Sequence, residues 1–144
     1  MDGTCESDRK RRYIILSQFV NKLKKFDDFI ELGGVSQDEI NRAENILGVK
    51  FAEEYIEYLL ECGVASVDGH EFTGNNKTKR LNVVDVTKEE LAKVEDFPEG
   101  AYVVEQAHID GVAIWQTEKG KIYLSQDNTM RLLCNSLNEY INLK

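Results

Sequence analysis

The chain has 144 residues, about the length of one domain, and 42% of them are hydrophobic, as is ordinary for a globular protein. Its formal net charge of −8 disfavours direct binding of nucleic acid, which needs Lys and Arg to neutralise phosphates. No apolar run approaches the roughly 20 residues of a membrane span, and the polar, acidic residues 1–8 do not resemble a signal peptide. We therefore expect a cytoplasmic protein, folded as one domain over residues 1–144, that binds neither nucleic acid nor membranes.

The three cysteines, Cys5, Cys62 and Cys134, lie far apart in the sequence. Their odd number and wide spacing match neither a disulfide framework nor a redox or zinc motif of paired cysteines. Cys62 and Cys134 sit in apolar contexts and are predicted to be small buried hydrophobic residues. This use of cysteine fits a reducing cytoplasm.

The N-terminal part is basic, with seven basic and five acidic groups in residues 1–30. The run Arg9–Arg12 follows Asp8 and opens a predicted helix, in which apolar residues recur every three to four positions as far as Phe26. A nucleic-acid or targeting patch is one interpretation of this run. The interpretation we favour is a solvated helix start, with residues 1–12 forming a flexible or frayed segment.

Two further helices are predicted in the first half of the chain. Ser36 and Glu39 have the spacing of a capping box, and the helix that follows is expected to end at Gly48 in the left-handed conformation. A second helix is predicted over 52–61, with tyrosine, isoleucine and leucine on one face and glutamates on the other, and Gly63 is its expected stop.

The hydrophobic period changes after this point. Residues 70–72 and 81–85 are predicted to be strands, and Thr87–Glu90 looks like a second capping box that opens a short helix to about Glu95. Three more strands are expected over 101–107, 112–116 and 122–125.

Hairpin turns are expected at Asp110-Gly111 and at Lys119-Gly120, between those three strands. The segment 130–134 is ambiguous, and a closing helix is predicted over 136–143. Helices followed by an antiparallel meander indicate an α+β fold rather than alternating α/β units.

No motif for catalysis or for a cofactor stands out. The two histidines, His70 and His108, do not pair with each other or with cysteine as metal ligands would. The sequence contains neither a nucleophile elbow nor a phosphate-binding glycine loop. Paired carboxylates such as Glu53-Glu54 could act as acid and base, but they lie on polar faces where solvation keeps them ionised. We expect no catalytic residue, no metal site and no cofactor.

An acidic region extends from residue 85 to residue 118, with nine acidic and only two basic side chains. It is either an ordinary solvated surface or a docking face for a basic protein, since complementary charge speeds encounter and sets specificity. The only tryptophan is either a buried sheet residue or an exposed anchor of that face. The candidate binding residues are Asp85, Glu89, Glu90, Glu95, Asp96, Glu99, Glu105, Asp110, Trp115 and Glu118.

The order of residues from Gln37 to Gly63 resembles the SUKH superfamily, which contains bacterial toxin-immunity proteins and yeast cell-wall-synthesis regulators of the Smi/Knr type. An acidic residue before a Leu-Gly step, an aromatic residue, a leucine pair and a glycine carry the resemblance. Ala52 stands where the family usually has proline, a departure that still permits helix initiation. The matching residues in this half are Glu44, Leu47, Gly48, Tyr55, Leu59, Leu60 and Gly63.

The later half also resembles the family, so that the similarity covers about residues 36–142. It lies in Val83-Val84 and Thr87, Tyr102–Val104, Asp110-Gly111, Gly120–Tyr123 and Ser136–Ile141. The resemblance implies one α+β domain, with helices packed on a bent, mostly antiparallel sheet. It carries no catalytic motif, and its matched residues look like core and turn positions.

The resemblance implies an immunity protein that binds a cognate basic toxin domain, often a nuclease in this family, and blocks it stoichiometrically. Nucleases hold phosphates in basic clefts, so an acidic inhibitor could occupy the cleft or its rim. The alternative is an adaptor in signalling or cell-wall regulation, and an enzyme is a third, weaker hypothesis. We expect a monomer or a weak dimer.

Overall fold

The computed structural model describes residues 18–107 and 111–143. The predictions for residues 1–12, for Cys5 and for the acidic Asp110 lie outside these residues. A helix occupies residues 18–24. The other elements in chain order are β1 (Ile30–Glu31), α2 (Gln37–Leu47), α3 (Glu53–Glu61), β2 (Ala65–Val67), β3 (His70–Phe72), the 3-10 helix η1 (Lys79–Leu81), α4 (Val83–Leu91), β4 (Tyr102–Gln106), β5 (Ala113–Gln116), β6 (Ile122–Gln126), β7 (Thr129–Cys134) and α5 (Leu137–Tyr140).

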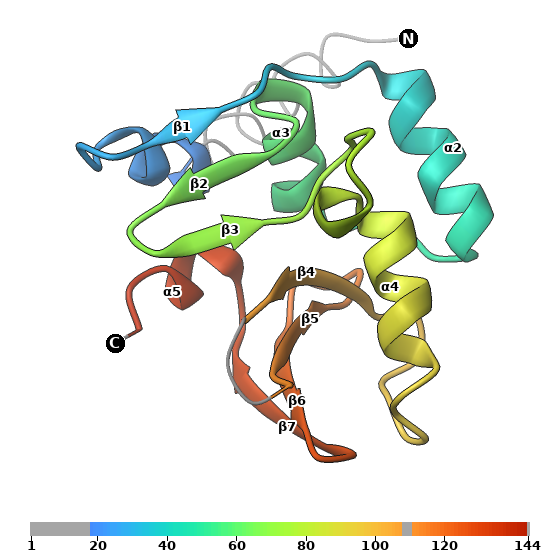
Figure 1. Cartoon of the computed structure of the whole chain (residues 1–144). Helices are drawn as coiled ribbons and strands as arrows, with labels where there is room; N and C mark the ends of the chain where they lie inside the picture. The colour runs from blue at the N-terminus through green and yellow to red at the C-terminus, as the bar shows by residue number, and fades with distance from the viewer. Residues whose placement is uncertain (1–17, 108–110, 144) are drawn as a thin grey trace, which may run out of the picture.

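The strands form one antiparallel sheet of seven strands in sequence order, from β1 to β7. Its two parts, β1–β3 and β4–β7, meet at a single registered pair, Phe72 with Glu105. Figure 1 shows β1–β3 turned relative to β4–β7, with α2 and α4 at one side and α5 near the junction. The register shifts between Val103 and Glu105, where a bulge increases local twist. The α+β fold with a meander and a closing helix is confirmed.

The larger core cluster lies between the helices and the sheet and is rich in aromatic rings. Tyr55 stands at its centre, with its ring centroid 5.5 Å from that of Tyr58 and 5.1 Å from that of Tyr102. Phe51 packs edge-on against both Tyr55 and Tyr102. Such ring pairs stabilise a fold by about 0.5–1.5 kcal/mol each beyond their buried area, so this cluster fixes α3 against the sheet.

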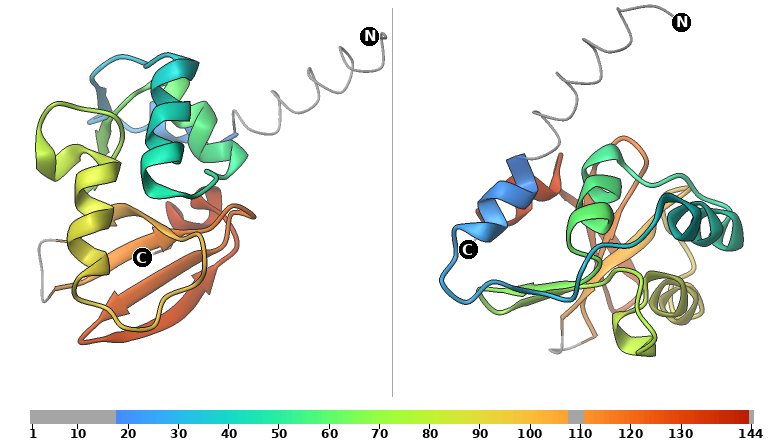
Figure 2. Two further views of the ribbon diagram at one scale, coloured as in Figure 1. Left: turned by 90° about the vertical axis from the view of Figure 1, so that its right-hand side faces the viewer. Right: turned by 90° about the horizontal axis from the view of Figure 1, so that it is seen from above.

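A second, smaller core cluster joins α4 to the other face of the later strands. Val86 from α4 packs in this cluster with Val103 and Trp115. The indole N–H of Trp115 donates to Ser125 Oγ at 2.9 Å, so the ring's polar atom is satisfied inside the protein. Figure 2 shows α4 lying across the later strands.

Several local predictions are confirmed. Ser36 caps α2 with a complete capping box, in which Glu39 is the partner, and Gly48 ends the helix with φ of +69°. The strands β3, β4, β5 and β6 lie where the alternation of residues predicts them. Gly120, with φ of +97°, provides the turn between β5 and β6.

The predicted strand at 81–85 and the predicted capping box at Thr87–Glu90 are both wrong. The helix α4 already begins at Val83, because the side chain of Asn82 accepts hydrogen bonds from Val84 N and Asp85 N. The Thr87 hydroxyl lies inside the helix and accepts a hydrogen bond from Val103 N at 2.9 Å instead of capping. One Asn cap outweighs the β-branched residues that suggested a strand.

Three strands were not predicted as such. Strand β7 occupies the ambiguous segment, and the short strands β1 and β2, of two and three residues, were not predicted. The closing helix α5 is shorter than expected, with Ser136 as its cap. Cys62 is buried as predicted and Cys134 is half-buried. Among the described residues, no helix has both the length and the apolar character that crossing a membrane requires.

We predict that Asn82→Ala lowers the free energy of unfolding by about 1 kcal/mol, because the first amides of α4 lose their acceptor. Asn82→Ser keeps a capping oxygen and should retain most of that stability. Urea unfolding of the two variants and the parent protein measures the difference. Equal losses in both variants would contradict a capping role for this side chain.

Candidate functional site

The predicted acidic residues separate into three exposed places in the structure. Asp85 and Glu89 lie on α4, and Glu95 and Asp96 lie in the segment that follows it. Glu99 and Glu118 lie elsewhere, on the two sides of a hollow. Of these exposed residues, only Glu99 and Glu118 line a hollow in the described part of the chain.

Three of the predicted binding residues are buried, which removes them from an exposed docking face. Trp115 has no exposed surface, so its interpretation as a core residue is confirmed and its interpretation as a surface anchor is wrong. Glu105 is 5% exposed and is held by Tyr140 and His70. Glu90 is also 5% exposed, and its carboxylate accepts a hydrogen bond from the side-chain amide of Gln106 at 2.6 Å. A buried, hydrogen-bonded carboxylate cannot meet a partner without losing its bonds.

The structure instead brings together acidic residues from both halves of the chain in a groove. The groove consists of two hollows, of about 600 and 500 Å³, that share Glu118. We call this feature the acidic groove. The first hollow is lined by Phe51, Ala52, Glu53, Glu54, Glu118, Lys119, Gly120, Asn135 and Ser136, and the second by Glu44, Asn45, Gly48, Val49, Lys50, Glu99, Gly100 and Glu118.

A chain of buried hydrogen bonds positions the first hollow. The Ala52 amide at the start of α3 donates to Tyr102 Oη at 2.8 Å, and this hydroxyl donates to Gln116 Oε1 at 2.9 Å. The amide nitrogen of Gln116 then donates to Glu54 Oε2 at 2.7 Å and to Gly120 O at 3.1 Å. The start of α3 and the β5–β6 turn are thus fixed to one another through the sheet.

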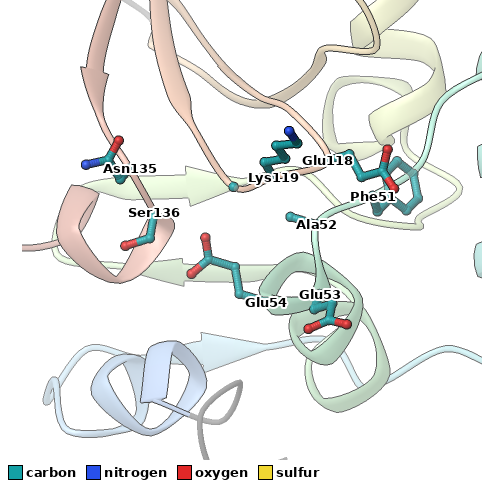
Figure 3. A pocket seen from close by; sticks show the side chains of 9 residues that line it. Phe51, Ala52, Glu53, Glu54, Glu118, Lys119, Asn135 and Ser136 are labelled. Carbon is teal, nitrogen blue, oxygen red and sulfur yellow. The ribbon is translucent and has the colours of Figure 1, made fainter. Parts of the chain in front are cut away.

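Glu54 connects the first hollow to two other elements of the chain. Besides Gln116, its carboxylate accepts from the amides of Leu137, at 2.6 Å, and of Asn138, at 3.3 Å. It therefore caps the start of α5, where a negative charge is favourable. In Figure 3 its side chain points from α3 toward Ser136. Burial raises the pKa of Glu54 above its ordinary value, although these hydrogen bonds oppose the rise.

The second hollow forms around the end of α2. Glu44 is buried and accepts from the Phe51 amide at 2.8 Å, which folds the segment after Gly48 back onto the helix. Glu99 faces this hollow from the segment before β4 and is exposed, as is Lys50. The exposed carboxylates of the groove therefore stand on a framework of satisfied, buried ones.

The electrostatics of the groove favour a cation. Five carboxylates line the two hollows, those of Glu44, Glu53, Glu54, Glu99 and Glu118, against the two amines of Lys50 and Lys119. Several negative charges on a concave surface concentrate the electrostatic potential there and attract positively charged groups. In the part of the chain that the structure describes, no group of three or more His, Cys, Asp or Glu side chains could hold a metal ion.

Sequence reasoning found Glu99 and Glu118 but missed Glu44, Glu53 and Glu54 as members of the same site. These three belong to a second acidic stretch, from residue 38 to residue 61, which holds seven acidic residues and only two basic ones. This excess of acidic over basic residues is the sequence signal that could have pointed to them. Nothing in the sequence showed that the two stretches meet in space.

The described residues thus form an α+β domain with an acidic groove. A family model described as SUKH_6, SMI1-KNR4 cell-wall, matches residues 37–141, and the chain belongs to this family. The resemblance to the SUKH superfamily is thereby confirmed. Members of the family are immunity or regulatory proteins and are generally non-catalytic. A search of curated proteins found no match.

We predict that Glu54→Ala lowers the free energy of unfolding by about 2–3 kcal/mol, because buried donors on Gln116 and Leu137 lose a charged acceptor. Glu118→Ala, at an exposed residue of the same hollow, should cost no more than about 0.5 kcal/mol. Urea unfolding tests both variants. Similar small losses would show that Glu54 does not hold the groove together.

Proposed function

We propose that this protein is an immunity protein, which binds a cognate toxin domain through the acidic groove and neutralises it without catalysis. Membership of the SUKH family supports the class, and the five carboxylates that line the groove support a basic partner. A nuclease domain fits this charge, because its phosphate-binding cleft is basic. The protein would act in the cytoplasm of the cell that makes the toxin.

The proposed mechanism is stoichiometric occlusion. Lysine and arginine side chains of the toxin would enter the groove and pair with Glu99 and Glu118, which are exposed and so accessible. Those basic side chains would then be unavailable to the phosphates of a nucleic acid. Complementary charge would mainly raise the association rate, and close contacts around the groove would set the lifetime of the complex.

A regulator of cell-wall synthesis is the second candidate, and the description of the matching family favours it. In that case the groove would bind a basic segment of a signalling or wall-synthesis protein. Both candidates use the same surface and differ in the partner, so one experiment separates them.

The experiment compares capture from source-cell lysate on three immobilised proteins: the parent, Glu99→Lys with Glu118→Lys, and Asp85→Lys with Glu89→Lys. The last is a matched control, because it reverses two exposed carboxylates of α4 that are outside the groove. We expect a basic toxin domain on the parent and the control and about tenfold less on the groove variant. Higher salt should weaken the captured complex.

The captured domain is then expressed with and without this protein, and cell growth and toxin activity are measured. Inhibition at one-to-one stoichiometry would establish immunity. Capture of wall-synthesis or signalling factors would favour the regulator instead. Equal capture by the groove variant and the parent would contradict the groove as the binding surface.

A further inference from the structure

The buried carboxylate of Glu105, outside the acidic groove, connects the two parts of the sheet to the C-terminal helix. Glu105 on β4 accepts a hydrogen bond from the Tyr140 hydroxyl of α5 at 2.6 Å. Its two oxygens each lie 3.1 Å from Nδ1 of His70 on β3. The amide of Glu71 approaches the same carboxylate at 3.4 Å. This cluster lies where β3 meets β4, next to the only registered pair of that junction among the described residues.

Packing holds the three side chains in this arrangement. The His70 ring stacks on Phe72 with centroids 5.5 Å apart and planes 13° from parallel, and it meets the Tyr140 ring edge-on at 5.4 Å. Glu105 and Tyr140 are buried, whereas the His70 side chain keeps 22% of its surface exposed. A proton can therefore reach the imidazole from solvent, while the carboxylate that receives its hydrogen bond stays inside.

The same short helix forms part of the acidic groove at its other end. Glu54 binds the Leu137 amide, and Asn135 and Ser136, just before the helix, line the first hollow. The α5 helix has only four residues, so its own hydrogen bonds give it little stability. Its position depends on Glu54 at the start, on Glu105 at the end and on the packing of its apolar side chains between them.

We propose that His70, Glu105 and Tyr140 form a proton-dependent clamp, which positions α5 and through it the Asn135–Ser136 side of the acidic groove. With His70 protonated, the imidazolium compensates the charge of Glu105, so the carboxylate is stable in the buried position where Tyr140 donates to it. With His70 neutral, the buried carboxylate loses its cation and α5 is held less tightly. His70, Glu105 and Tyr140 are positioning residues, because they line neither hollow of the groove.

The charged and titratable groups around the clamp are mostly acidic. Asp68 acts on His70 by its charge, and Tyr58 from α3 and Cys134 from β7 face the same cluster. Arg80 is the nearby cation, but it pairs with Glu71 at 2.5 Å. His70 is thus the group whose charge change within the neutral range acts directly on Glu105.

The direction of the pH effect follows from these contacts. The hydrogen bond with Glu105 raises the pKa of His70 above its ordinary value of about 6.5, although burial opposes the rise. A raised pKa in the folded state stabilises the protein below the unfolded value, and this contribution is lost as pH rises through the folded value. The clamp is therefore tight at mildly acidic pH and loosens toward alkaline pH.

Amide hydrogen exchange, corrected for its intrinsic dependence on pH, tests the clamp in the full-length protein. The amides of Tyr140 and Ile141, which bond within α5, and of Leu137, which binds Glu54, report on the helix. We expect their protection to fall about tenfold between pH 6 and pH 9, whereas the Gly48 amide at the end of α2 should be unaffected. Unchanged protection at α5, or a fall at Tyr140 without one at Leu137, would overturn the proposal.

Substitutions separate the clamp from simple packing. His70→Gln should abolish the pH dependence, whereas replacing the other histidine, in His108→Gln, should preserve it. Tyr140→Phe keeps the ring and its packing but removes the hydroxyl, so protection of α5 should fall several-fold at pH 6. In a proton NMR titration, Glu105→Gln should lower the pKa of His70 toward its ordinary value, and an unchanged pKa would contradict the clamp.

The link from the clamp to binding rests on the proposed function, but these measurements need no partner. If no toxin is found while exchange and titration behave as expected, the clamp stands and the proposed function fails. If a toxin binds through the groove while α5 shows no pH dependence, the function stands and the clamp fails.

Discussion

The acidic groove depends on the carboxylate of Glu54, which joins three elements that are far apart in the sequence. Gln116 lies 62 residues away and Leu137 lies 83 residues away, and both donate hydrogen bonds to it. The donors of Gln116 and Leu137 are buried and costly to leave unpaired, so the start of α3, the end of β5 and the start of α5 must stay together. The hollow between them is a consequence of that requirement.

A division of roles among acidic residues follows from this arrangement. Buried carboxylates, those of Glu44, Glu90 and Glu105, each accept hydrogen bonds inside the protein and hold its elements in place. Exposed ones, such as Glu99 and Glu118, remain available to a partner. Counting acidic residues in a sequence does not distinguish the buried kind from the exposed kind. The burial of each side chain in the structure does.

Sequence patterns predicted the elements whose cause is local. The Ser36 capping box and the alternation in β4, β5 and β6 were sufficient to place them. The patterns failed where one contact decides the structure, as at Asn82, whose side chain starts α4 within an apparent strand. The candidate site was predicted only in part. Folding brings Glu54 and Glu118 to the same hollow, and their positions in the sequence do not indicate this. The sequence did not decide whether Trp115 is a core residue or a surface residue. Its burial follows from the packing of the folded chain.

Family membership and charge together lead to the central claim, that a basic protein docks in the acidic groove. The most direct test places a photo-crosslinking amino acid at Glu118 in one protein and at Asp85 in another and irradiates the source cells. We expect a crosslink from position 118 to a lysine- and arginine-rich surface of one partner, and none from position 85. A partner crosslinked from position 85 and not from position 118 would show that the groove is not the docking surface.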